Sequence, residues 1–188
     1  MKNIKYIILS LILFGSVNLT AQSQHITSEK ASIKWTANKV GGSHNGTIDL
    51  KEGHLIWDHD QITSGKFVVD MQSIKDTDLQ DEGYNKKLVD HLKSADFFGV
   101  EEFPEAILEI TGSTVLAGNK YKVLANLTIR GITHPIEFDA VKEGDKLMAT
   151  LTIDRSKYDV KYSSKSFFQN LGDKLIYDDF VLEIVVTK

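Results

Sequence analysis

Alternation of apolar and polar side chains is clearest between residues 121 and 141. Apolar residues occupy every second position from Tyr121 to Ile129, and mostly polar residues lie between them. A period of two is typical of a β-strand with one dry face. A second alternating run follows Gly131 and extends to Val141. The short turn between the two runs predicts an antiparallel pair of strands.

The same alternation predicts strands along most of the remaining chain. The first covers Ala31 to Ala37 and leads into a turn through Gly41-Gly42. A short hairpin around Glu52-Gly53 is expected to join strands at 47–50 and 54–57. Further alternating runs predict strands at 65–71, 106–110, 147–153 and 180–186, so the chain contains eight or nine strands.

One long interval, from Gln72 to Phe103, separates two of these strands. About 30 residues without regular structure would be unusual in a compact domain, so we expect helix there. Apolar and aromatic residues recur at helical spacing between Tyr84 and Leu92, and Ser94-Ala95-Asp96 could cap a second short helix through Phe97 and Phe98.

These elements predict an all-β fold, an antiparallel eight-stranded barrel with a short helical insertion. Closure of the sheet removes exposed strand edges, which makes an up-and-down barrel the economical solution. An eight-stranded barrel is wide enough either to fill with its own side chains or to hold one small ligand. A two-sheet sandwich is the alternative architecture.

The N-terminus has the form of a secretory signal peptide. Lys2 and Lys5 precede an apolar run from Tyr6 to Val17, and small residues lie before Gln22. The run is shorter than the roughly 20 apolar residues of a membrane span. We therefore expect residues 1–21 to be removed and residues 22–188 to form one domain, located in the periplasm or secreted, with no integral membrane segment after cleavage.

Composition excludes several classes of function. Removal of residues 1–21 leaves 20 basic and 26 acidic side chains, a net charge of −6, and no basic run, which argues against nucleic acid as a partner. The chain has no cysteine, so disulfides, thiol catalysis and thiolate metal sites are excluded. Packing alone must stabilise the fold.

Five motifs in order resemble the YceI-like family over nearly all of residues 30–187. The motifs are Trp35 with Asn38 to Gly46, Gly65 to Ile74, His91 to Phe98 followed by Phe103-Pro104, Leu127 to Pro135, and Ile153 to Ser156. The resemblance implies an extended, lipocalin-like barrel, mostly in exported bacterial proteins. It also implies an interior that holds a polyisoprenoid, a prenylated quinone or a fatty-acid derivative. Where many members read Arg-Ser-Asp-Phe-Gly, this chain has Arg155-Ser156-Lys157-Tyr158-Asp159, which puts the head-group preference in question.

We expect the ligand to contact apolar residues on the inner face of the barrel and a few residues near its rim. These are Ile33, Trp35, Phe67, Val69, Leu108, Val123, Ala125, Leu127, Phe138, Leu151, Arg155, Tyr158, Phe167, Phe168 and Ile184. Arg155 shares the parity of Ile153 and should point inward, where a guanidinium requires a partner. That partner is either a carbonyl or carboxylate of the protein, which we favour, or a ligand head group.

No catalytic or metal motif stands out. The six histidines lack H-E-x-x-H or comparable spacing, and the local cluster of His54 and His59 with Asp58 and Asp60 is expected to be solvated. Gly41 to Asn45 departs from a nucleophile elbow at its fifth position. We therefore expect no enzymatic activity, no metal and no cofactor apart from a bound isoprenoid or lipid.

Two functions from different classes remain open at this point. The first is a carrier, store or sequestering protein for one long apolar ligand. The alternative is an envelope protein-interaction or inhibitory module whose barrel is filled and whose loops, especially 72–103, form the working surface. A homodimer is possible through the helical insertion, although no stripe of residues there is diagnostic.

Overall fold

The computed structural model describes residues 21–187, and the signal peptide predicted for residues 1–21 lies almost wholly outside this range. Nine strands, one α-helix and three short 3-10 helices follow in the described range. They are β1 (Gln22–Ile26), η1 (Ser28–Lys30), β2 (Ala31–Lys39), β3 (Gly42–Asp58), β4 (Gln61–Asp76), α1 (Glu82–Lys93), β5 (Glu105–Val115), β6 (Lys120–Ile129), β7 (Ile132–Glu143), β8 (Lys146–Asp154), η2 (Arg155–Tyr158), η3 (Gly172–Lys174) and β9 (Ile176–Thr187).

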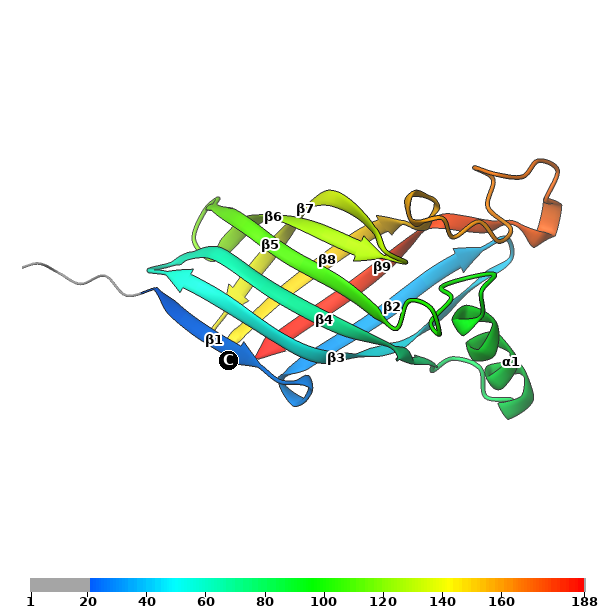
Figure 1. Ribbon diagram of the computed structural model, residues 1–188, viewed down its shortest axis with the longest axis horizontal. Helices are drawn as coiled ribbons and strands as arrows, with labels where there is room; N and C mark the ends of the chain where they lie inside the picture. The colour runs from blue at the N-terminus through cyan, green and yellow to red at the C-terminus, as the bar shows by residue number, and fades with distance from the viewer. Residues whose placement is uncertain (1–20, 188) are drawn as a thin grey trace, which may run out of the picture.

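Strands β2 to β9 form a closed antiparallel barrel. Each strand from β4 to β9 pairs with the next along the chain, β9 pairs with β2, and the β3–β4 ladder completes the circle. The barrel is long and strongly twisted, with α1 at one end and β1 toward the other (Figure 1). The eight-stranded barrel predicted from the alternation is confirmed, and the sandwich is excluded.

The predicted hairpin around Glu52-Gly53 is wrong. Strand β3 continues from Gly42 to Asp58, pairing with β2 along its first half and with β1 along its second half. A Cβ at Gly53 would lie 2.7 Å from the ring of Phe67, its partner on β4. The glycine therefore makes room for an aromatic ring across the ladder instead of forming a turn.

The turn predicted at Gly131 is confirmed. Ile129 and Ile132 pair across the two residues Arg130 and Gly131, whose φ angles are 51° and 71°. Positive φ at both central positions is the geometry of a type I′ hairpin, which matches the twist of the flanking strands. β6 and β7 remain in register from this turn to the pair Lys120 and Val141.

The helical insertion contains one helix, not two. Helix α1 begins after Asp81, whose side chain accepts a hydrogen bond from the Tyr84 amide at 2.9 Å. The second helix predicted through Phe97 and Phe98 is wrong, because residues 95–98 form turns. In those turns the Ser94 carbonyl accepts from the amides of Phe97 and Gly99.

The interior of the barrel differs between its two ends. Toward β1, bulky side chains such as Ile26, Leu55, Ile62 and Val123 fill the space and are almost completely buried. Toward α1, the inner residues of β9 are only partly buried although they pack against the core. The barrel is therefore solid in one half and incompletely filled in the other.

Candidate functional site

A cavity of about 130 Å³ lies in the half of the barrel next to α1. Its walls come from β2, β3, β4, β5, β6, β8 and β9 and from the segment that begins in α1. The lining residues are Ile33, Trp35, Ala37, Ile48, Val69, Met71, Ile74, Leu92, Phe97, Phe98, Ala106, Ile107, Leu108, Leu127, Ile129, Leu151, Ile153, Arg155, Ile176, Tyr177, Phe180, Leu182 and Ile184. Only Arg155 among them is charged. From Ile176 to Ile184 the lining follows β9 for about 26 Å at the usual rise of a strand.

The end of the cavity is covered by the segment that follows α1. Phe97 is buried, Phe98 is partly buried, and the two rings meet edge to face at 5.1 Å. Arg130, in the β6–β7 turn, holds this segment by donating from Nη1 to the carbonyls of Phe97 at 2.6 Å and Ala95 at 3.3 Å. Its guanidinium also lies 5.3 Å from the ring centre of Phe103. The covering segment is thus tied to the barrel wall.

Arg155 is a buried cation at this end, and its partners are groups of the protein itself. Its Nε donates to the carbonyl of Tyr177 at 3.2 Å, Nη1 to Val160 at 2.9 Å and Nη2 to Ile176 at 3.1 Å. Nη2 also lies 3.4 Å from Oδ1 of Asp178. The inward parity and the protein partners expected for Arg155 are both observed.

Burial dominates the electrostatics of this arginine. Desolvation lowers the pKa of Arg155, and the nearby carboxylates of Asp178 and Asp154 oppose that shift. The guanidinium also lies 5.3 Å from the ring centre of Phe97, which places it against the covering segment. Three of its N–H groups donate to the carbonyls named above, whereas the contact with Oδ1 of Asp178 is an ion pair and not a hydrogen bond.

Eight of the fifteen expected ligand contacts line this cavity. They come from six strands and from η2, and are Ile33, Trp35, Val69, Leu108, Leu127, Leu151, Arg155 and Ile184. Trp35 is oriented by a hydrogen bond of 3.2 Å from its Nε1 to the carbonyl of Lys75. The period of two in these strands was sufficient to place them on the inner face.

The other seven lie elsewhere. Val123 and Ala125 are buried in the filled half, Phe138 is buried and Phe67 packs against the core, and none of these four borders the cavity. Tyr158 is buried beside His134, with ring centres 5.3 Å apart. Phe167 and Phe168 are exposed in the loop before η3 and do not border the cavity.

Sequence reasoning missed the aromatic and small residues that complete the cavity. Leu92, Phe97 and Phe98 come from the insertion, whose contact with the barrel interior no periodicity reveals. Ala37 and Ala106 lie at lining positions on β2 and β5, where small side chains leave space. Small residues at inward positions were a usable signal, but Ala125 carries the same signal in the filled half.

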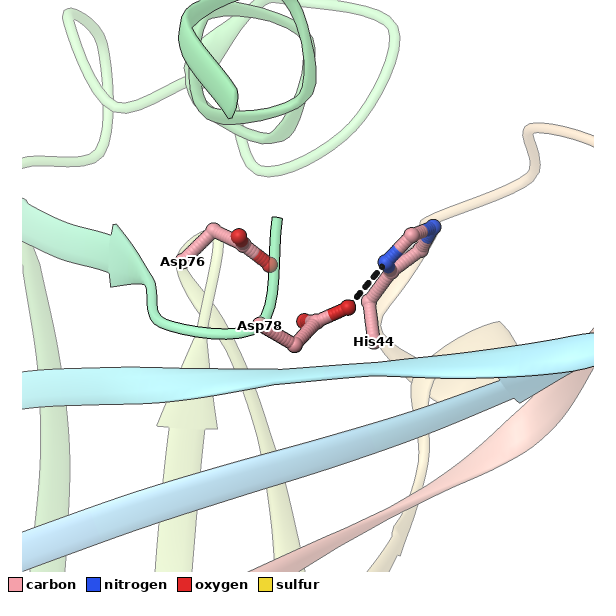
Figure 2. A group of neighbouring side chains, drawn as sticks. All are labelled: His44, Asp76 and Asp78. Atoms are coloured by element: carbon pink, nitrogen blue, oxygen red, sulfur yellow. Dashed lines mark hydrogen bonds and ion pairs between the residues drawn. The ribbon is translucent and has the colours of Figure 1, made fainter. Parts of the chain in front are cut away.

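A polar cluster outside the cavity joins β3 to the loop before α1 (Figure 2). His44, Asp76 and Asp78 each direct a potential ligand atom into a group within 4.8 Å. His44 Nδ1 lies 3.0 Å from Oδ2 of Asp78, whose Oδ1 accepts from the Asn45 amide at 2.8 Å. This cluster was not expected, because His44 lies more than 30 residues before the two aspartates in the sequence.

Asp76 carries the unsatisfied group of the cluster. Its Oδ1 accepts from the Leu79 amide at 2.9 Å and from Asn85 at 3.1 Å, whereas Oδ2 is buried and has no hydrogen-bond partner among residues 21–187. Burial raises the pKa of Asp76, and the neighbouring Asp78 raises it further. Hydrogen bonds from Asn45 and His44 lower the pKa of Asp78 despite its desolvation. The raised pKa of Asp76 means that the folded protein holds a proton on this carboxyl more readily than the unfolded chain does.

Comparison with known proteins identifies the family. A family model described as the YceI-like domain matches residues 24–187. The chain belongs to the YceI-like family. This match covers the whole barrel and the helical insertion, so the resemblance expected from the five motifs is confirmed.

Curated relatives are similar over only part of their length. A UPF0312 protein of Pseudomonas putida strain W619 is 28% identical over 118 residues, which are 62% of this chain and 59% of that protein. A UPF0312 protein of Staphylococcus aureus strain bovine RF122 is 34% identical over 84 residues, covering 39% and 46% of the two chains. The matched part therefore spans about half of these relatives.

Solved structures share the fold of this YceI-like chain at low sequence identity. BcnA of Burkholderia cenocepacia superposes with a TM-score of 0.64 and 19% identity over 87% of this chain and 99% of that one. A polyisoprenoid-binding domain from Saccharophagus degradans gives a TM-score of 0.59 and 12% identity over 89% and 97%. Within residues 21–187 no helix has the length and apolarity needed to cross a membrane.

Proposed function

We propose that this YceI-like protein is a non-catalytic binding protein for one long apolar molecule, which it transports, stores or sequesters. The observation that carries the proposal is the cavity, elongated along β9 and lined by apolar side chains with a single charged residue at one end. Such a lining gives a hydrocarbon chain the contacts it lacks in water. It supplies no pair of acid and base groups, which is why we propose binding and not catalysis.

The class of ligand is inferred from the shape of the cavity and from one structural relative. A protein of the same fold is described as a polyisoprenoid-binding domain. A polyisoprenoid, a prenylated quinone or a fatty-acid derivative would each place a flexible chain along the cavity. Arg155 is the charged residue of the lining, so a quinone or carboxylate head group would meet a charged donor there.

Burial of the chain is sufficient to explain useful affinity. Each buried methylene contributes about 0.8 kcal/mol, so 15 chain carbons would contribute roughly 12 kcal/mol. Association costs at least about 4 kcal/mol in lost freedom, which leaves roughly 8 kcal/mol, a micromolar dissociation constant. The cavity of about 130 Å³ is close to the volume that holds one benzene ring, so a full chain requires rotation of lining side chains.

Tryptophan fluorescence offers a direct test. The chain has two tryptophans; Trp35 lines the cavity and Trp57 packs against Tyr121 in the filled half. Quinones quench indole fluorescence at short range, so a prenylated quinone should quench Trp57→Phe strongly and Trp35→Phe weakly. Equal quenching of both variants, or none in the wild type, would contradict the proposed location.

Export to the periplasm or medium is the second part of the proposal. It rests on the charged, apolar and small-residue regions of residues 1–21. Residues 1–25 fused to a reporter that is active only outside the cytoplasm should direct its secretion. Reporter activity that stays inside the cell would refute this part and leave ligand binding untouched.

The alternative, an interaction or inhibitory module, is favoured by one observation. Large apolar side chains are exposed near the end that carries α1, among them Tyr84, Phe167 and Phe168. Exposed apolar groups of this kind often mark a surface for partners. A wild-type protein that quenches with no apolar quinone would move the assignment to this alternative.

A further inference from the structure

Strands β7 and β8 are paired along only part of their length. Only four residue pairs join the two strands, from Ala140 with Ala149 to Glu143 with Lys146. On their other sides, β7 pairs with β6 and β8 pairs with β9 along nearly their full lengths. If the β7–β8 ladder continued in register, Glu137 would face Thr152, but these positions are not paired.

The separated strands bound an open slot of about 930 Å³. Its lining combines outer residues such as Glu137, Asp139 and Thr152 with inner residues such as Phe138 and Leu151. Inward and outward residues can border the same space only where neighbouring strands of the barrel are separated. Outside the lining of the slot, β7 contacts the η2 segment that follows β8, where Nε2 of His134 lies 3.0 Å from the carbonyl of Lys157.

The strand edges along the slot are unsuited to an added β-strand. Since Ile129 and Ile132 flank a two-residue hairpin, alternate residues of β7, including Pro135, turn their backbone toward β8. Proline has no N–H to offer at that edge. Beyond it, Lys122 forms ion pairs with Glu137 at 3.4 Å and Asp139 at 2.6 Å. Proline and charges are the usual protection of a free edge against strand pairing.

The slot shares a wall with the cavity. Leu151 on β8 and Ile184 on β9 line both spaces, so two aliphatic side chains separate them. The end of the cavity near α1 is covered by Phe97 and Phe98, and Arg130 ties that cover to the barrel. Rotation of Leu151 and Ile184 would open a path through the side of the barrel without breaking those hydrogen bonds.

We propose that the slot between β7 and β8 is the lateral portal through which a long apolar chain enters and leaves the cavity. The proposal rests on the proposed function and adds the route and the residues that separate the two spaces. A chain that enters sideways need not thread end-on past the covering segment. During entry, part of the chain can also occupy the slot, which offers room that the cavity of about 130 Å³ does not.

A covalent bridge across the slot tests the portal. The chain contains no cysteine, so the double variant Glu137→Cys and Thr152→Cys can be bridged selectively by a flexible bis-maleimide. Mass spectrometry identifies the protein in which one linker joins both thiols of the same chain. The matched control is Glu109→Cys with Asn126→Cys, which face each other in the intact β5–β6 ladder. Both proteins are also prepared with each thiol capped by N-ethylmaleimide. Stopped-flow quenching of Trp35 by a prenylated quinone gives the association and dissociation rates.

The bridge across the slot should slow both rates at least tenfold relative to the capped protein and leave the dissociation constant within about threefold. Protein bridged after loading should retain the quinone, and the β5–β6 bridge should change neither rate. Unchanged rates in the slot-bridged protein, with normal affinity, would overturn the portal and leave the proposed function standing. Absence of quenching in the wild type would overturn the proposed function, and the portal with it.

Discussion

Ala106→Phe should occupy the cavity from within and abolish ligand binding while leaving the barrel folded. Ala106 lines the cavity on β5, opposite Val69 on β4. The substitution adds one phenyl ring, and an apolar cavity of about 150 Å³ is known to accommodate benzene. The observed cavity of about 130 Å³ is close to that size, so the ring fills existing space with modest adjustment.

Ala125→Phe is the matched control, because it adds the same ring in the filled half. Ala125 is 3% exposed between Val123 and Leu127 on β6 and does not border the cavity. Overpacking a dense core costs about 1 to 3 kcal/mol. Filling the cavity at Ala106 should cost less than about 1 kcal/mol, since burial of a phenyl side chain contributes about 1.5 to 3 kcal/mol against any strain.

Ligand affinity should change in the opposite order to stability, falling in Ala106→Phe and staying near wild type in Ala125→Phe. A ring at Ala106 displaces about four or more ligand carbons at roughly 0.8 kcal/mol each, which weakens binding at least 100-fold. The dissociation constant of Ala125→Phe should stay within about threefold of wild type. Denaturant unfolding and quinone titration of both variants measure the two effects. Strong destabilisation by Ala106→Phe, together with normal binding, would refute the assignment of the cavity.

Substitutions at three positions other than Ala106 and Ala125 test further contacts. Gly46→Ala should destabilise the barrel by about 1 to 3 kcal/mol in denaturant unfolding, because the added Cβ would collide with the Lys75 carbonyl oxygen. A variant as stable as wild type would show that β3 shifts freely at this position. Asp76→Asn should gain stability relative to wild type as pH rises, because the raised pKa of Asp76 means that the folded state resists its ionisation. The gain begins near the unfolded pKa of this carboxyl and levels off above its folded pKa. A difference that stays constant across pH would contradict the raised pKa of Asp76, as would stabilisation of wild type by a divalent cation that the variant loses. Arg155→Leu should cost about 3 to 5 kcal/mol because it leaves Asp178 buried without its cation, and adding Asp178→Leu should restore part of that loss; no recovery in the double variant would show that the carbonyl contacts of Arg155 dominate.

The periodicity of side chains was enough to predict the barrel and much of its inner face. Alternate burial is observed along β6 and in the second half of β8, where one face of the strand lies against the core and the other is more exposed. It failed around Gly53, where a glycine required by the ring of Phe67 looked like a turn. The bulges in the β3–β4 ladder further obscured the alternation along β4.

The division of the barrel into filled and hollow halves could not be predicted. Val123, Ala125 and Leu127 share one face of one strand, yet only Leu127 borders the cavity. Whether a residue on this face borders the cavity depends on how far the opposing strands and the covering segment at Phe97 reach inward. That distance is set by tertiary packing. The slot beside β7 is equally invisible in sequence, because Ile136 and Phe138 continue the alternation although their strand has lost its partner.

The central claim is that the barrel carries one long apolar molecule, and native mass spectrometry of the gently purified protein tests it most directly. The spectrum should contain a species heavier than the protein by one lipid, and organic extraction should release an isoprenoid or acyl compound at close to one per chain. Ala106→Phe, purified in the same way, should lack that species, and Ala125→Phe should retain it. A wild-type protein without bound lipid that also fails to take up a prenylated quinone would contradict the claim.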